Sequence, residues 1–214
     1  MEAGDKHPFD IDVVMDRVRE AVEPFPKAAM FELRDDGFAT PFEQLVACIL
    51  SIRTRDETSL VAARRLFAEA RTPDALAAMD LAEIDAAIDD VTFHERKAVQ
   101  IREIATAVRD EHGGALPCDP DLMQGFAGVG PKCANLAAGV ACGMEVISVD
   151  IHVHRVTNRW GYVATKTPEQ TMTMSGRSSV WNRRFSSSSD PSTSTFTPFD
   201  AKPVRPASVT SRHW

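Results

Sequence analysis

Apolar residues recur at helical spacing through the first 174 residues of the chain. Such spacing places apolar side chains on one face of an α-helix, where they can pack into a core. The only strand-like run, residues 146–149, is too short to build a sheet. We therefore expect an all-α protein. The expected helices cover residues 11–22, 42–52, a segment after Asp56, a short segment from Pro73, and residues 81–88, 94–112, 120–126, 131–143 and 151–160.

Residues that cap or end helices support these limits. Asp10 and Asp56 can accept hydrogen bonds from the free N–H groups of a first helical turn. Pro73 suits a first turn because its ring fixes φ near the helical value. Gly113 and Gly114 follow the expected helix 94–112 and are typical of a helix end.

The helical pattern stops near residue 174. Residues 175–214 are rich in Ser, Thr and Pro and have no apolar periodicity. A segment of this composition buries too little surface to offset the entropy that ordering costs. We expect this tail to be largely disordered.

The composition is that of an ordinary globular protein, with 43 % hydrophobic residues. No run approaches the roughly 18 apolar residues that a membrane-spanning helix needs, and the charged N-terminus is unlike a secretory signal. The four cysteines form neither a CxxC metal pattern nor a dense disulfide framework. We expect a cytoplasmic protein with four buried thiols. The cysteines are Cys48, Cys118, Cys133 and Cys142.

The net charge of −7 at first argues against a nucleic-acid partner, because phosphates prefer basic surfaces. Binding depends on the local field, however, rather than on the charge of the whole chain. Residues 122–144 include Lys132 and no carboxylate, and residues 175–214 carry a net charge of +4. The acid-free window is a place where an anion can dock on an otherwise acidic protein.

Residues 119–143 predict a helix-hairpin-helix, in which the turn Gly128-Val129-Gly130 leads into a second helix opened by Pro131. Glycine permits positive φ and the close approach of another backbone. The second helix offers free N–H groups and the positive end of its dipole to a phosphate, which binds DNA without reading its sequence. A plain tight turn between packed helices is the alternative interpretation.

Two other glycine motifs fit poorly. A dinucleotide-binding GxGxxG would need glycine at position 133, which is Cys133, and a strand before it. A phosphate-binding GxxxxGK[ST] loop fails because Pro131 separates Gly130 from Lys132.

Lys132 and Asp150 are the candidate catalytic residues. Lys132 falls in the first turn of a helix, where the dipole disfavours a cation. The dipole and partial burial would lower its pKa and increase the share of nucleophilic amine; a solvated surface lysine is the ordinary alternative. Asp150 can also cap the helix that follows it. Because Asp150, His152 and His154 do not share one helix face, we expect no metal site.

With the hairpin, the lysine and the aspartate together, the sequence resembles the endonuclease III family of the helix-hairpin-helix DNA glycosylase superfamily. The resemblance covers about residues 41–170, through PFEQLVACILSIRTRDE, FHERKAVQI, FAGVGPKCAN and VDIHVHRVTNR. It implies two helical lobes with DNA in the cleft between them. The first would be a six-helix barrel over residues 34–144. The second, formed by residues 1–33 and 145–174, would be truncated.

The resemblance also implies roles for single residues. Lys132 falls on the family's Schiff-base lysine and Asp150 on its catalytic aspartate, while Gly128, Val129 and Gly130 would contact the DNA backbone. The implied protein is a monomeric base-excision-repair glycosylase with abasic-site (β-elimination) lyase activity on damaged double-stranded DNA, with oxidised pyrimidines as the default lesion. Such an enzyme would act in the bacterial cytoplasm, at the nucleoid. The alternative is a catalytically impaired DNA-binding remnant, because the second lobe is truncated.

Two features depart from the family pattern. Arg53 stands where the family commonly has a glutamine that fills the gap left by a flipped-out base. Phe93 is no departure, since it lies where the family has a loop residue that wedges the duplex. Many members also have four cysteines that hold an iron–sulfur cluster, and this chain has no cysteine after Cys142. Since only thiolates could hold that iron, we expect no cofactor.

Overall fold

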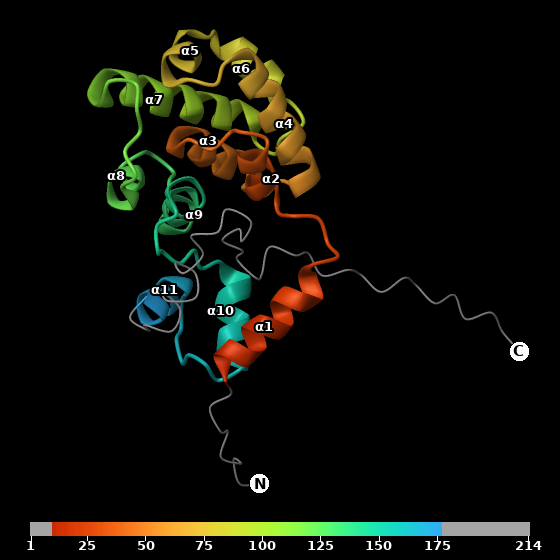
Figure 1. Ribbon diagram of the computed structural model, residues 1–214. Helices are drawn as coiled ribbons and strands as arrows, with labels where there is room; N and C mark the ends of the chain where they lie inside the picture. The colour runs from red at the N-terminus through yellow and green to blue at the C-terminus, as the bar shows by residue number, and fades with distance from the viewer. Residues whose placement is uncertain (1–9, 177–214) are drawn as a thin grey trace, which may run out of the picture.

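The computed structural model describes residues 10–176, and within that range it consists of α-helices and connecting segments without a β-strand (Figure 1). The all-α expectation is confirmed. The tail expected to be disordered lies outside the described residues, apart from Ser175 and Gly176 at the end of the last helix. The helices are α1 (Ile11–Val22), α2 (Ala29–Asp35), α3 (Pro41–Ser51), α4 (Asp56–Glu69), α5 (Pro73–Ala78), α6 (Leu81–Ala87), α7 (His94–His112), α8 (Pro120–Gln124), α9 (Pro131–Cys142), α10 (Ile151–Arg159) and α11 (Pro168–Gly176).

Local sequence explains most of these limits. Thr40 and Glu43 form a reciprocal capping box at the start of α3, and Thr72 caps α5 by accepting from the amide of Ala75. α7 ends at Gly113, whose φ of 61° is the left-handed conformation that glycine adopts freely. The capping role expected of Asp56 is wrong, because Asp56 is already inside the first turn of α4.

Two helices, α2 and α11, were not expected from the sequence. α2 contacts α3, α4 and α9, and its Met30 and Leu33 side chains belong to the main hydrophobic core. The lobe boundary expected at residue 34 therefore falls inside a helix of the first lobe. Helix α11 packs against α10.

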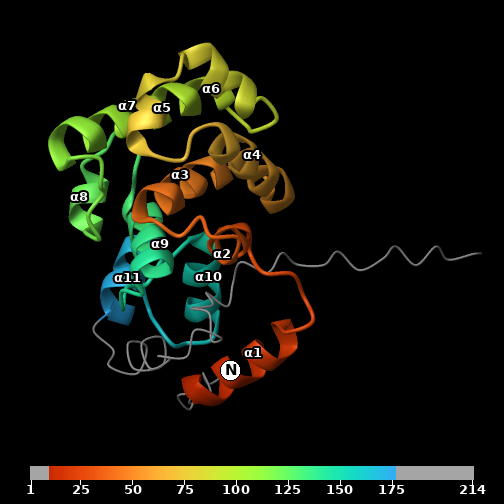
Figure 2. The ribbon, with the colours of Figure 1, turned by 45° about the horizontal axis from the view of Figure 1, so that its top comes forward.

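Helix α3 lies at the centre of the first lobe. All nine residues from Phe42 to Leu50 are buried, because the helix contacts α2, α4, α7 and α9. Figures 1 and 2 show α2–α9 gathered around it, with α10 and α11 beyond α9. None of the helices within residues 10–176 is long and apolar enough to cross a lipid bilayer.

The four cysteines form two disulfide bonds, so the expectation of free thiols is wrong. Cys48 of α3 is joined to Cys133 of α9, and Cys118 is joined to Cys142. The first bond ties the start of α9 to the central helix. The second joins the segment before α8 to the end of α9, so it brackets the hairpin between those helices.

Candidate active site

Helices α8 and α9 pack against each other and form the expected helix-hairpin-helix. Asp119 caps α8, because its side chain accepts hydrogen bonds from the amides of Asp121 and Leu122 at 2.9 and 3.2 Å. The turn then runs from Gly125 to Gly130, which is the N-cap residue of α9.

The last three residues of the turn, Gly128, Val129 and Gly130, differ in conformation and burial. Gly128 has a φ of +77°, a conformation that L side chains rarely adopt. Gly130 has an ordinary φ of −94°, and a Cβ added there would meet no protein atom within 4 Å. The side chain of Val129 lies in the core, and its amide donates to the carbonyl of Phe126. Val129 therefore helps to hold the turn together, and its expected contact with the DNA backbone stays a prediction.

Helix α7 supports the turn from behind, through a residue that the sequence did not single out. The side-chain amide of Gln100 donates to the carbonyl of Ala127 at 2.8 Å. A Cβ at Gly128 would lie 2.8 Å from the same nitrogen, Gln100 Nε2, which is closer than real Cβ contacts come. The turn therefore packs closely against α7 at Gly128.

The N-terminus of α9 is open to an anion. Its N-cap, Gly130, has no side chain to accept a hydrogen bond, and the first turn contains no acidic residue. Within the described residues, Ala134 is the first amide of the helix with a backbone acceptor, the carbonyl of Gly130. The amides of Lys132 and Cys133 precede it and point from the positive end of the helix dipole.

Lys132 and Asp150, the two candidate catalytic residues, lie close together. The Lys132 Nζ lies 4.0 Å from Asp150 Oδ2, and their side chains are 50 % and 19 % exposed. The lysine is therefore less enclosed than the sequence led us to expect. Asp150 is the N-cap of α10, and its Oδ1 accepts from the amides of His152 and Val153 at 2.9 and 2.8 Å. One carboxylate oxygen holds the helix and the other faces the amine.

The extended segment before Asp150 is hydrogen-bonded to α9. Ser148 Oγ donates to the carbonyl of Lys132 at 3.0 Å, and Asn135 Nδ2 donates to the carbonyl of Ile147 at 2.9 Å. These two contacts set the position of the aspartate relative to the lysine. Sequence analysis missed both residues, because a single Ser or Asn gives no sign of a partner more than ten positions away.

The histidines near Asp150 have other surroundings. His154 lies 2.7 Å from the hydroxyl of Thr171, between α10 and α11, whereas His152 is exposed. Across residues 10–176 there is no group of three His, Cys, Asp or Glu side chains arranged to hold a metal ion.

Arg53 and Phe93 come from separate loops and lie side by side. Both have positive φ, 56° and 62°, and both are exposed. The Arg53 guanidinium carbon is 6.0 Å from the centre of the Phe93 ring, within the range of a cation–π contact. The sequence located each residue but did not show that they form a pair.

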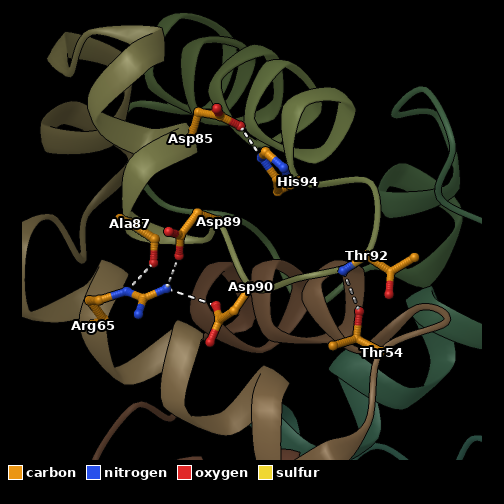
Figure 3. A network of polar contacts seen from close by, with 8 residues as sticks. All are labelled: Thr54, Arg65, Asp85, Ala87, Asp89, Asp90, Thr92 and His94. Carbon is orange, nitrogen blue, oxygen red and sulfur yellow. Dashed lines mark hydrogen bonds and ion pairs between the residues drawn. The ribbon is translucent and has the colours of Figure 1, made fainter.

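The turn before Phe93 is held by charged side chains, which Figure 3 shows from close by. Arg65 of α4 donates to the carbonyl of Ala87 and pairs with Asp89 and Asp90. At the start of α7, the hydrogen bond with Asp85 raises the pKa of His94. The turn is thus attached to α4 and to α6.

The groups described above could together bind a polyanion and react with a sugar that is part of it. An amine beside a carboxylate can act as a nucleophile with a proton acceptor at hand. The open N-terminus of α9 can bind a phosphate group. The paired Arg53 and Phe93 project from the surface and can enter a second molecule.

Comparison with known proteins shows the family of the chain. Residues 46–179 match the HhH-GPD superfamily, described as base excision DNA repair proteins. Endonuclease III of Thermotoga maritima is 35 % identical over 159 residues, covering 74 % of this chain and 71 % of that protein. Endonuclease III of Escherichia coli strain K12 is 30 % identical over 157 residues, covering 73 % and 71 %.

Solved structures of endonuclease III–DNA complexes are also similar to this chain. A non-covalent endonuclease III–DNA complex is similar with a TM-score of 0.65 and 26 % identity, over 83 % of this chain and 84 % of that one. A trapped endonuclease III–DNA covalent intermediate is similar with a TM-score of 0.64 and 26 % identity, over 83 % and 85 %.

The two hairpin glycines should respond differently to substitution. Gly128→Ala forces a left-handed conformation on an L residue, which costs roughly 1–2 kcal/mol, and crowds Gln100. Gly130→Ala meets neither obstacle. Thermal unfolding should therefore show a lower Tm for Gly128→Ala and a parental Tm for Gly130→Ala. Equal Tm values for the two variants would contradict this description of the turn.

Proposed function

Since the chain belongs to the endonuclease III family of the HhH-GPD superfamily of base excision DNA repair proteins, we propose that Lys132 is its nucleophile and Asp150 its acidic partner. The chain is a DNA glycosylase with abasic-site lyase activity, and we propose oxidised pyrimidines in duplex DNA as its substrates. The observation that carries the assignment is the 4.0 Å approach of the Lys132 amine to Asp150 at the open end of α9. We further propose that the protein acts as a monomer at the bacterial nucleoid.

DNA would be held mainly through its backbone. The open N-terminus of α9 would bind a phosphate through amides and the helix dipole, which is independent of base sequence. Gly130 supports this role, because the space beside it is empty of protein atoms. Arg53 and Phe93 would enter the duplex where the damaged base leaves the stack, since the glycosidic bond cannot be reached inside it.

The reaction would then proceed at C1′ of the flipped-out nucleotide. The neutral amine of Lys132 attacks C1′, and the bond between C1′ and the base breaks with its electron pair leaving on the base. The carboxylate of Asp150 stabilises the positive charge that develops on the sugar and accepts a proton from the attached nitrogen. Opening of the sugar ring gives an imine between Lys132 and C1′.

The imine makes strand cleavage possible. It acidifies the proton on C2′, whose removal expels the 3′ phosphate by β-elimination. Water then hydrolyses the imine and restores the free amine of Lys132. Asp150 can exchange a proton with the Lys132 nitrogen because its Oδ2 stays directed at the lysine while the helix amides hold its Oδ1.

We propose that this chain uses no iron–sulfur cluster. A cluster of the kind expected from the family needs four thiolates. All four cysteines of the chain are instead paired in disulfide bonds. The donor set therefore does not fit a cluster, and none of the proposed steps requires one.

Substitution of Lys132 tests the nucleophile. Lys132→Ala should abolish covalent trapping by borohydride on duplex DNA with an abasic site, because no imine can form, while binding to the same duplex stays largely intact. Asp150→Asn should slow base removal and imine turnover by at least about tenfold and retain some trapped complex, since catalysis by a positioned acid–base group is worth about 10²–10⁴-fold.

Lys166→Ala is the matched control, because Lys166 is an exposed lysine outside the site. It should trap like the parent. Trapping by Lys132→Ala at the parental level would identify another amine as the nucleophile. Binding without trapping by every protein, the parent included, would favour the catalytically impaired DNA-binding remnant.

A β-branched side chain at Gly130 should weaken binding to any duplex. Gly130→Val would fill the space beside the open end of α9 and keep a phosphate from approaching its amides. Affinity should fall by a similar factor for damaged and undamaged DNA, as measured by fluorescence anisotropy at one salt concentration. If a correctly folded Gly130→Val variant kept the parental affinity for DNA, the hairpin would be a structural turn only.

The proposed absence of a cluster can be checked on the purified protein. The 214-residue chain, purified without oxygen, should be colourless and contain no stoichiometric iron by elemental analysis. About four iron atoms per chain, the content of one [4Fe–4S] cluster, would overturn the proposal.

A further inference from the structure

Arg53 and Phe93 share an unusual backbone conformation. Each has a φ near +60°, which residues other than glycine seldom adopt. Such a conformation persists only where the surrounding structure holds it. Both side chains are exposed, with Phe93 at 53 %, so their own packing does not account for it. The support must come from the residues beside and beneath them.

Lys97 of α7 lies beneath the loop that carries Arg53. The residue is only 5 % exposed, and its Nζ donates to the carbonyls of Leu50 and Ile52 at 2.9 and 2.7 Å. A third, longer contact reaches the hydroxyl of Thr54 at 3.4 Å. The Lys97 ammonium therefore binds the backbone before Arg53 and the Thr54 side chain after it.

Thr54 connects this loop to the one that carries Phe93. Its hydroxyl oxygen accepts from the backbone amide of Thr92 at 3.2 Å, the contact drawn on the right of Figure 3. Thr92 directly precedes Phe93, and Thr54 directly follows Arg53. A single hydroxyl thus joins the neighbours of both exposed side chains.

Burying the Lys97 ammonium to make these contacts is unfavourable in free energy. Burial lowers the pKa of Lys97 to about 8, because a cation loses hydration where little solvent reaches it. An apolar side chain of the same length would avoid that cost. What the lysine provides, and an apolar residue would not, is three donors for the loop around Arg53.

We propose that Thr54 and Lys97 are positioning residues that hold Arg53 and Phe93 as one rigid pair for insertion into the damaged duplex. The proposal rests on the proposed function, in which these two side chains enter the DNA. Holding both in place beforehand avoids the entropy of ordering two loops when the base leaves the stack. Arg65 and the His94–Asp85 pair hold the far side of the turn, so the Thr54 bridge acts against a fixed frame.

Thr54 allows a sharp test, because one atom separates the variants. Thr54→Val removes the hydroxyl and keeps the shape, whereas Thr54→Ser keeps the hydroxyl. Each protein is mixed with a duplex that has a tetrahydrofuran abasic analogue beside 2-aminopurine, whose fluorescence rises when it unstacks. Binding to the undamaged duplex and thermal unfolding are measured alongside.

Thr54→Val should reduce the fluorescence response by about tenfold, the change that loss of one hydrogen bond produces in an equilibrium constant. Thr54→Ser should respond within about twofold of the parent, since its hydroxyl can make the same bond. Affinity for undamaged duplex should be the same for all three proteins. Lys97→Met should resemble Thr54→Val in the fluorescence response.

A double-mutant cycle then separates positioning from general loosening. Thr54→Val should have little further effect in a Phe93→Ala background, because the bridge acts through Phe93. Independent effects of the two substitutions would overturn the proposal, as would a parental response from Thr54→Val or an equal loss in Thr54→Ser. If the parent itself gives neither a fluorescence response nor borohydride trapping, the proposed function fails and this inference with it; failure of the variants' pattern alone leaves the function standing.

Discussion

The burial of α3 on all sides is the constraint on which the site depends. Because its residues from Phe42 to Leu50 are enclosed, the helix has one position relative to its neighbours. α9 packs on it, and the Cys48–Cys133 bond ties the residue after Lys132 to it. The C-terminal end of the same helix leads into Arg53. The proposed nucleophile, Lys132, and the proposed DNA-entering residue Arg53 are therefore both connected to one rigid helix.

Backbone groups and side chains have separate proposed roles at the site. The open end of α9 offers amides and a helix dipole, which suit any phosphate. Lys132 and Asp150 stand at the starts of two different helices, α9 and α10, and Ser148 fastens the connecting segment to α9. The proposed DNA binding and the proposed chemistry therefore depend on different atoms of the same region, so one substitution should remove one without the other.

The two side chains proposed to enter the DNA lie in loops with local backbone strain. Arg53 and Phe93 are the non-glycine residues with positive φ among residues 10–176. Both lie in short loops fixed by buried or ion-paired groups, Lys97 on one side and Arg65 on the other. Such positions are typical of sites where a shape must exist before the partner arrives.

The sequence by itself predicted most of the helices, the hairpin and the family, and it named Lys132 and Asp150 as the candidate catalytic residues. Apolar periodicity located most helices, and Asp10 and Asp150 marked helix starts because capping is a local interaction. The sequence did not reveal α2, whose burial depends on distant helices, or the disulfide partners of Cys48 and Cys118. The Lys132–Asp150 distance, the contact of Gln100 with the turn and the Thr54 bridge were decided only by tertiary structure. Each of these contacts joins residues that lie 18 or more positions apart. Apolar periodicity predicts which side chains of a helix are buried, but it does not identify the distant residues that they contact.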